Sequence, residues 1–267
     1  MEQNSTFKIG ITDSGFGGLS MVSEFQKSYP DVEIIYFADL KNAPYGEKDK
    51  SQVQALVQSA SDVLIQEDVK AILLACNTAT SVAVESLRNH LSIPIFGMEP
   101  AIKPALNATE NEKVAVLATS LTLKEDRFLS LKNKIDPMNR IISVNCPGLS
   151  ELIDQEKIDE AIEYVQAILL KEDLQGIHSV VLGCTHYIFL KERLQILFPE
   201  ISFFDGNKGT LNHIVNTCQI QKSQQVNKQF NKQENWKFIT NLNQSKNVQI
   251  ARHWMQELQT DKYTRAT

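Results

Sequence analysis

Short, almost continuously hydrophobic runs alternate with longer stretches of mixed polarity along most of the chain. The hydrophobic runs predict β-strands at residues 7–12, 33–37, 70–75, 94–97, 113–118, 140–144, 178–182 and 201–204. The mixed stretches predict helices, among them residues 52–66, 79–89, 158–170 and 187–197. Strands with little polar alternation are typical of parallel sheets that are buried on both faces, and strands that alternate with helices indicate βαβ units. The pattern therefore predicts an α/β protein with mostly parallel sheets flanked by helices, in which ligands bind at the carboxyl ends of the strands.

Two of the predicted strands end in the same way. Residues 70–78 read KAILLACNT and residues 178–186 read HSVVLGCTH, so each strand is followed by a small residue, a cysteine and polar side chains. The two cysteines are about one domain length apart, although a chance repeat would look the same. This repeat predicts two similar α/β domains, one formed by residues 1–98 and 211–267 and the other by residues 99–210. A predicted strand at 236–240 and a helix at 249–258 would return the chain to the first domain.

Composition narrows the classes of function. The chain has 267 residues, of which 27 are Lys or Arg and 32 are Asp or Glu, and its net charge is −5. Without a strongly basic segment, direct contact with nucleic acid is not expected. The sequence shows neither a signal peptide nor an apolar stretch long enough to span a membrane, so we expect a cytoplasmic protein. Residues 221–233 are rich in Gln, Asn and Lys, and this composition indicates a surface loop.

The four cysteines are too widely spaced for a zinc site or a redox pair, and no metal site is predicted. A cysteine in such a chain is usually a small buried hydrophobic residue, and we interpret Cys146 and Cys218 as structural or incidental. Cys76 and Cys184 differ, because each is expected at the N-terminus of a helix, which lowers the pKa of a thiol. In addition, His186 lies two residues after Cys184.

Two kinds of chemistry fit these thiols. Cys184 and His186 could form the nucleophile and base of a cysteine hydrolase, but Cys76 would then have no role. If both thiols act, one thiolate removes a proton from one face of a carbon and the other thiol protonates the opposite face. The second reaction inverts a stereocentre and explains why the cysteine-bearing element occurs twice.

Two more polar clusters lie at or near the ends of predicted strands. Residues 12–20, TDSGFGGLS, are rich in glycine but match neither the dinucleotide-binding nor the P-loop spacing. A strand-to-helix turn with Asp13 and Ser14 at its edge fits better, and its N–H groups could hold a carboxylate. Asp13 could also be an ordinary helix cap. Residues 43–48, APYGEK, predict a turn that presents Tyr45.

Together, the motifs DSGFGGLS, PYGEK, ACNTAT, GMEPAI and GCTHY resemble the glutamate racemase family in order and spacing, from about residue 9 to residue 212. The resemblance implies a cofactor-independent amino-acid racemase whose active site lies in the cleft between two α/β domains. It implies that Cys76 and Cys184 are the two acid/base thiols, assisted by Asp13 and His186, respectively. A role in supplying D-glutamate for peptidoglycan and a homodimeric assembly are further implications.

The resemblance also implies the substrate contacts. The residues that would hold glutamate are Asp13, Ser14, Pro44, Tyr45, Gly46, Asn77, Thr78, Thr119, Thr122, Thr185 and His186. Asp154 stands where the family usually has a glutamate that supports the histidine, and it is expected to be a further acid/base helper. The alternatives are a racemase of aspartate or another amino acid, a decarboxylase or isomerase of a small diacid, and a non-catalytic amino-acid-binding relative with a protein partner such as DNA gyrase.

Overall fold

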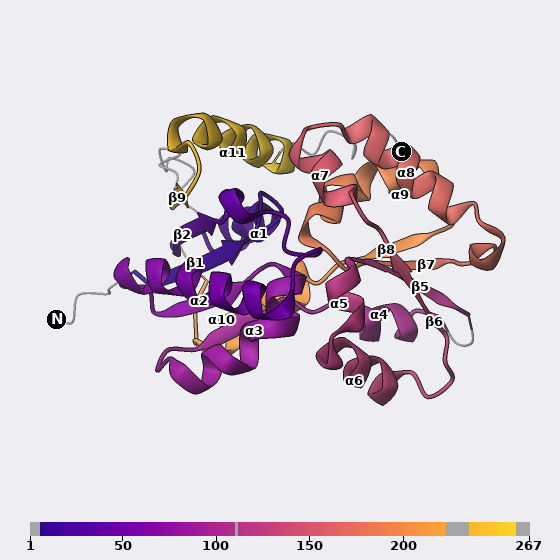
Figure 1. Cartoon of the computed structure of the whole chain (residues 1–267), viewed down its shortest axis with the longest axis horizontal. Coiled ribbons are helices and arrows are strands. Elements are labelled where there is room, and N and C mark those ends of the chain that lie inside the picture. Colours follow the sequence, from indigo (N-terminus) through magenta and orange to yellow (C-terminus); the bar gives the residue numbers. More distant parts are fainter. Residues whose placement is uncertain (1–5, 110–111, 223–234, 260–267) are drawn as a thin grey trace.

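Two parallel β-sheets lie side by side in the computed structural model, which describes residues 6–109, 112–222 and 235–259 (Figure 1). The first sheet has the strand order β4-β3-β1-β2-β9. Its strands are β1 (Lys8–Asp13), β2 (Glu33–Ala38), β3 (Ala71–Leu74), β4 (Ile95–Gly97) and β9 (Trp236–Thr240). The second sheet, β6-β5-β7-β8, contains β5 (Val114–Ala118), β6 (Ile141–Asn145), β7 (Ser179–Leu182) and β8 (Ser202–Phe204). The strand pairs that the structure describes are parallel, so the predicted fold class is confirmed.

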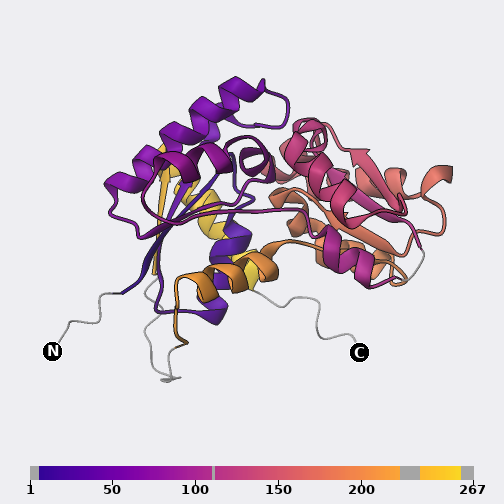
Figure 2. The same ribbon diagram turned by 90° about the horizontal axis from the view of Figure 1, so that it is seen from below.

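Helices flank both sheets, as the view turned by 90° also shows (Figure 2). Around the first sheet lie α1 (Leu19–Ser28), α2 (Lys50–Gln66), α3 (Asn77–His90), α10 (Asn207–Thr217) and α11 (Gln244–Gln259). Around the second lie α4 (Ile102–Asn107), α5 (Ser120–Lys124), α6 (Asp126–Ile135), α7 (Leu149–Asp154), α8 (Ile158–Leu169) and α9 (Lys191–Leu197). Short 3-10 helices occur at η1 (Leu40–Asn42), η2 (Glu172–Leu174) and η3 (Thr185–Leu190).

The burial of the strands follows from their composition and their place in the sheet. Every residue of β3, β5 and β7 is buried, as expected for strands covered on both faces. By contrast, β6 mixes buried and exposed residues along its length, because it is an edge strand of the second sheet. The helix predicted at 187–197 is divided into η3 and α9. In η3, Thr185, His186 and Tyr187 are all buried, so the segment lacks the one-sided burial of a surface α-helix.

The two sheets repeat one topology. In each sheet the first strand along the chain lies between the second and the third, and the fourth pairs with the third. Cys76 follows the third strand of the first sheet and Cys184 the third strand of the second. The repeat seen in the sequence is therefore a repeat of structure, and the two thiols occupy equivalent places.

The C-terminal part of the chain returns to the first sheet, as predicted, because β9 pairs with β2. The expected domain boundary at residue 211 falls within helix α10. This helix contacts α1 and β4, which both belong to the first half of the chain. The domain limits themselves stay a prediction. Of the polar segment 221–233, all but the first two residues lie outside the described part of the chain. Within the described residues, no helix has the length and hydrophobicity that a membrane span requires.

Candidate active site

The carboxyl ends of the central strands of both sheets meet where the two halves of the chain touch. Because β1 and β3 are neighbours, Asp13 and Cys76 lie at adjacent strand ends. From the other half, the Thr185 hydroxyl donates a hydrogen bond to Asp13 Oδ2 over 2.9 Å. The hydroxyl oxygens of Thr78 and Thr119, also from different halves, are 2.9 Å apart. Polar residues from separate sequence motifs thus form one contiguous cluster.

Cys76 is the N-cap residue of α3 and only 6% exposed. Its Sγ accepts a hydrogen bond from the backbone N–H of Ala79 at 3.5 Å and lies 3.8 Å from the hydroxyl oxygen of Ser14. Burial, followed by the negative charge of Asp13, raises the pKa of Cys76 to about 12, and these effects outweigh the hydrogen bond from Ala79. The expectation of a lowered pKa at this helix N-terminus is therefore wrong, because desolvation is the larger effect. A thiolate formed here is a strong base.

Cys184 precedes η3, and its surroundings differ from those of Cys76. Its Sγ lies 3.8 Å from Nδ1 of His186, and the other ring nitrogen, Nε2, is 2.9 Å from Oδ1 of Asp154. Burial lowers the pKa of His186, but the charge of Asp154, its hydrogen bond and the nearby Cys184 together raise that pKa well above its usual value. The imidazole is consequently held in its charged form beside the Cys184 thiol.

Asp13 contacts its own loop and the opposite half of the chain. Its carboxylate accepts hydrogen bonds from the backbone N–H of Gly15, at 3.0 Å, and from Thr185. Burial raises the pKa of Asp13, although the charge of His186 and these two hydrogen bonds reduce the rise. The effect of Asp13 on Cys76 is electrostatic, since its charge raises the pKa of that thiol.

Three threonine hydroxyls form a triangle between α3 and the start of α5. The oxygen of Thr78 is 2.9 Å from that of Thr119 and 3.2 Å from that of Thr122, and the last two are 2.9 Å apart. Thr119 is also the N-cap residue of α5. Because each hydroxyl can both donate and accept, this triangle can bind either a carboxylate or an ammonium group.

The loop around Tyr45, between η1 and α2, contacts the second half of the chain. Pro44 follows a cis peptide bond, and the buried hydroxyl of Tyr45 donates to Oδ2 of Asp39 at 2.5 Å. A Cβ atom on Gly46 would lie 2.6 Å from Cβ of Thr119, so only glycine allows this approach. The sequence does not mark Asp39 as a site residue, because its partners come together only in the folded chain.

Two glycines of the first motif allow its backbone to approach His186. A Cβ atom on Gly15 would lie 2.6 Å from Nε2 of His186, and one on Gly17 would lie 2.4 Å from the hydroxyl oxygen of Thr185. Cβ atoms essentially never approach other atoms this closely. The glycine density that resembled a phosphate-binding loop therefore serves the contact between the two halves.

A protein-family model described as Asp/Glu/hydantoin racemase matches residues 19–214. The chain belongs to this family. A glutamate racemase from Leptospira interrogans is 49% identical over 215 residues, covering 80% of this chain and 84% of the relative. A glutamate racemase from Clostridium novyi is 43% identical over 230 residues, covering 85% and 86% of the two chains. The family assignment drawn from the five motifs is thus confirmed.

Solved racemase structures agree in fold. Glutamate racemase from Bacillus anthracis superposes with a TM-score of 0.76 at 28% identity, covering 94% of both chains. The Escherichia coli glutamate racemase, solved with L-glutamate and an activator, superposes with a TM-score of 0.72 at 28% identity, covering 82% of this chain and 84% of that one. The two-domain α/β architecture is therefore shared with enzymes of the family.

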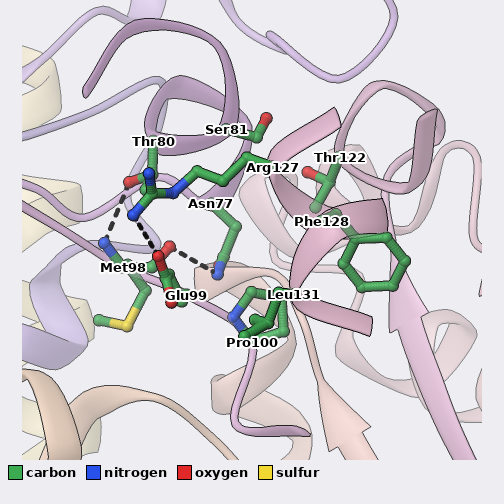
Figure 3. A pocket seen from close by; sticks show the side chains of 10 residues that line it. All are labelled: Asn77, Thr80, Ser81, Met98, Glu99, Pro100, Thr122, Arg127, Phe128 and Leu131. Atoms are coloured by element: carbon green, nitrogen blue, oxygen red, sulfur yellow. Dashed lines mark hydrogen bonds and ion pairs between the residues drawn. The ribbon is translucent and has the colours of Figure 1, made fainter. Parts of the chain in front are cut away.

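In this racemase, Asn77 joins α3 to the segment that links the two halves. Its side-chain amide donates to the backbone oxygen of Met98 at 3.1 Å. A cavity of about 20 Å³ lies beside it, lined by Asn77, Thr80, Ser81, Met98, Glu99, Pro100, Thr122, Arg127, Phe128 and Leu131 (Figure 3). A volume of this size holds about one water molecule and no amino acid.

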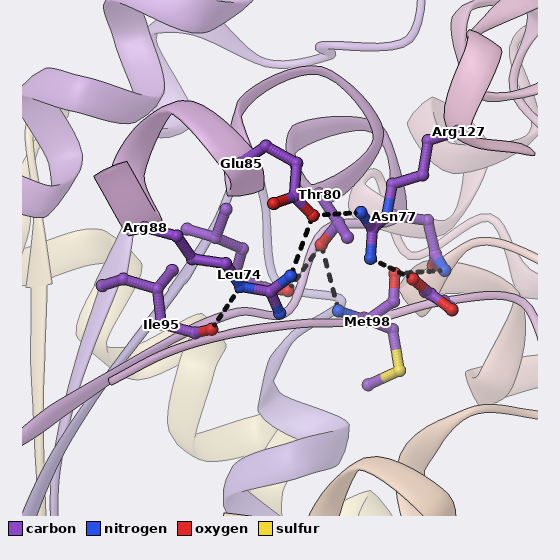
Figure 4. Close-up of polar contacts among 9 residues, drawn as sticks. Leu74, Asn77, Thr80, Glu85, Arg88, Ile95, Met98 and Arg127 are labelled. Atoms are coloured by element: carbon purple, nitrogen blue, oxygen red, sulfur yellow. Dashed lines mark hydrogen bonds and ion pairs between the residues drawn. The ribbon is translucent and has the colours of Figure 1, made fainter. Parts of the chain in front are cut away.

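Arg127 of α6 ties the halves together next to this cavity. Its guanidinium forms ion pairs with Glu85 on α3, at 2.6 Å, and with Glu99 in the linking segment (Figure 4).

Among the described residues, no group of three or more His, Cys, Asp or Glu side chains has the arrangement of a metal site. Cys146 is buried in the hydrophobic core, as its sequence context suggested.

Replacing Gly17 by alanine is expected to separate the first motif from Thr185 and His186. We expect kcat of the racemase to fall by about tenfold or more, because small displacements of acid/base groups are costly. The free energy of unfolding should also fall, by about 1–3 kcal/mol, since the new methyl group has no space. Enzyme kinetics and urea unfolding measure the two effects.

Gly209→Ala is the matched control. A Cβ atom at Gly209, in α10, meets no atom within 4 Å. This variant should keep full activity and gain about 0.5–1 kcal/mol of stability, because alanine is the better helix former. Wild-type kinetics in Gly17→Ala would show that the close approach does not matter for catalysis.

Proposed function

We propose that this racemase is a cofactor-independent glutamate racemase that works with two cysteines and supplies D-glutamate for peptidoglycan synthesis. The observation that carries the proposal is the pair of buried thiols, Cys76 and Cys184, in equivalent positions at the facing strand ends of two similar sheets. Curated relatives that are 39–49% identical over most of the chain and named glutamate racemase support the substrate.

The reaction needs one base and one acid on opposite faces of the α-carbon. A thiolate takes the α-proton, so the C–H bond breaks, an S–H bond forms, and the electron pair is delocalised into the substrate carboxylate. The opposite thiol then gives its proton to the other face, forming the new C–H bond and leaving a thiolate. In the reverse direction the two cysteines exchange roles. Exchange of the thiol protons with water restores the starting form for another turnover in the same direction, and no oxidant is required.

The surroundings of the two thiols suit this chemistry in different ways. The α-proton of an amino acid is only weakly acidic, so a thiol whose pKa is raised to about 12 gives a thiolate of high basicity. Cys184 instead has the charged His186 beside it, and Asp154 fixes the orientation of that imidazole. On the Cys76 side, the negative charge of Asp13 contributes to the raised pKa of the thiol.

Hydroxyl, amide and backbone groups around the thiols would bind the ammonium and carboxylate groups of glutamate. We assign this role to Ser14, Pro44, Tyr45, Gly46, Asn77, Thr78, Thr119, Thr122 and Thr185, with contributions from Asp13 and His186. The side chains come from both halves of the chain and are already in contact, for example through Thr78 and Thr119. The same proposal includes a cytoplasmic location, a homodimeric assembly, no direct contact with nucleic acid, and catalysis without a metal.

Incubating the purified protein with L-glutamate in D₂O is expected to give racemic glutamate with deuterium at the α-carbon. Optical rotation and mass spectrometry follow the two changes, and a parallel incubation with L-aspartate tests the nearest alternative substrate. Preferential exchange of aspartate would move the assignment to an aspartate racemase. If neither amino acid exchanges its α-proton, the proposed function is wrong.

A further inference from the structure

Asp39, directly after β2, is a buried carboxylate that the proposed chemistry does not use. It is only 3% exposed, and it accepts hydrogen bonds from three side chains. The Tyr45 hydroxyl donates to Oδ2 at 2.5 Å, while the amides of Asn42 and Asn241 donate to Oδ1 at 2.8 and 2.5 Å. A buried carboxylate is unfavourable unless its oxygens are hydrogen-bonded, so these donors are what allows Asp39 to be there.

Asp39 links two parts of the candidate active site. Its backbone N–H donates to the backbone oxygen of Asp13 at 3.0 Å, which fixes Asp39 next to the first motif. Through Tyr45 it also holds the loop that reaches the second half. In that loop the backbone oxygen of Gly46 accepts a hydrogen bond from the N–H of Leu121 at 3.3 Å.

Asn241 reaches Asp39 from the far end of the sequence because of the strand register. In the parallel pairing of β2 with β9, Ala38 lies opposite Thr240, so the next residues, Asp39 and Asn241, emerge side by side. Asn241 makes a second contact, since its Oδ1 accepts from the backbone N–H of Lys41 at 3.0 Å. One asparagine side chain thus fixes both the carboxylate and the backbone that follows it.

The Tyr45 hydroxyl donates its hydrogen bond to the Asp39 carboxylate. Its donated hydrogen bond to Asp39 makes it an anchor for the loop, and the neighbouring glycine then packs against Thr119. The contacts form a continuous series from Asn241 through Asp39 and Tyr45 to the threonines at the junction of the two halves.

We propose that Asp39 is a positioning residue of this racemase and that Asn241 orients it, so that the return strand β9 fixes the substrate-binding loop. The expected change in KM for glutamate rests on the proposed function, whereas the expected change in the hydrogen exchange of the loop does not. The loop should therefore respond to changes at Asp39 and Asn241 even though neither residue is expected to touch the substrate.

Asp39→Asn, Tyr45→Phe and the double variant test the series. Asparagine at position 39 keeps one acceptor oxygen and turns the other into a donor, which cannot accept from Tyr45 or Asn241. We expect KM for glutamate to rise roughly tenfold, the effect of losing a hydrogen bond to a charged group, with kcat changed less than about threefold. The double variant should be no worse than Asp39→Asn, because both changes break the same contact.

Asn241→Ala and Leu242→Ala form a matched pair at the end of β9, where both side chains are exposed. Amide hydrogen exchange of residues 45–48 should be several-fold faster in Asn241→Ala, together with a higher KM, and unchanged in Leu242→Ala. If Asp39→Asn does not fold, Asn241→Ala and Leu242→Ala still test the proposal.

Wild-type KM and wild-type loop exchange in Asp39→Asn and Asn241→Ala would overturn the proposal, as would multiplicative losses in the double variant. If the wild-type protein does not racemise glutamate, the proposed function fails, and the exchange measurement still decides whether Asp39 positions the loop.

Discussion

Cys76→Ser and Cys184→Ser are each expected to lower kcat for glutamate racemisation by about 10²- to 10⁴-fold, the usual contribution of one acid/base group. Serine keeps the size of the side chain, but its hydroxyl is far less acidic than a thiol, so it neither forms the base nor donates the proton readily. Because the two enantiomers are equally stable, kcat/KM falls by the same factor in both directions. Racemisation rates alone therefore cannot tell the two thiols apart.

Exchange in D₂O, with each enantiomer supplied separately, does distinguish them. Each single variant keeps the thiol that faces one side of the α-carbon, so it should exchange the α-proton of one enantiomer with retention of configuration. Cys76→Ser and Cys184→Ser should act on opposite enantiomers. Mass spectrometry after chiral separation measures this pattern.

Cys218→Ser is the control, because Cys218 is a free, half-buried thiol that the proposed mechanism does not use. It should racemise glutamate at the wild-type rate. A variant of Cys76 or Cys184 that keeps wild-type racemisation would contradict the two-thiol mechanism and return the chemistry to a single cysteine.

Asp154→Asn is expected to have the second-largest effect. The Asp154 carboxylate, 2.9 Å from Nε2, is the strongest of the influences that raise the pKa of His186. In the variant this pKa should fall, so His186 loses its proton at lower pH. We expect the alkaline limb of the kcat profile to move to lower pH and kcat at pH 8 to fall by about tenfold or more. Histidine resonances followed by NMR report the pKa directly.

The same substitution should change how stability depends on pH. The pKa of His186 is higher in the folded protein than the unfolded value of about 6.5. Its stabilising contribution is therefore fully present below about pH 6.5 and is lost as the pH rises through the folded pKa. The free energy of unfolding should differ most between wild type and Asp154→Asn at about pH 6, and less at pH 9, as urea unfolding can measure.

Glu156→Gln is the matched control for Asp154→Asn, because it also removes a carboxylate next to a histidine. It removes an exposed carboxylate that lies 3.6 Å from the exposed His253. Exposed ion pairs contribute little, so neither the pH profile nor the stability should change measurably. An unchanged pKa of His186 in Asp154→Asn would show that this carboxylate does not control the imidazole.

The sequence by itself determined the β-strands and the repeat. Each of the eight strands first predicted is found within one residue of its expected ends, and the strand at 236–240 has its expected bounds. Buried parallel strands are recognisable because hydrophobicity along a short segment is a local property. The cysteines at equivalent strand ends, and the motifs around them, were visible for the same reason and were sufficient to indicate the family.

Only the tertiary structure decided how those motifs act on one another. The raised pKa of Cys76 depends on how deeply α3 and its neighbours bury the thiol, whereas the sequence showed only a helix N-terminus. The contacts of Asp39 with Asn241, and of Asp13 with Thr185, join residues far apart in the chain. Their distances follow from strand register and from the packing of one half of the chain against the other, and no local pattern of hydrophobic residues encodes these.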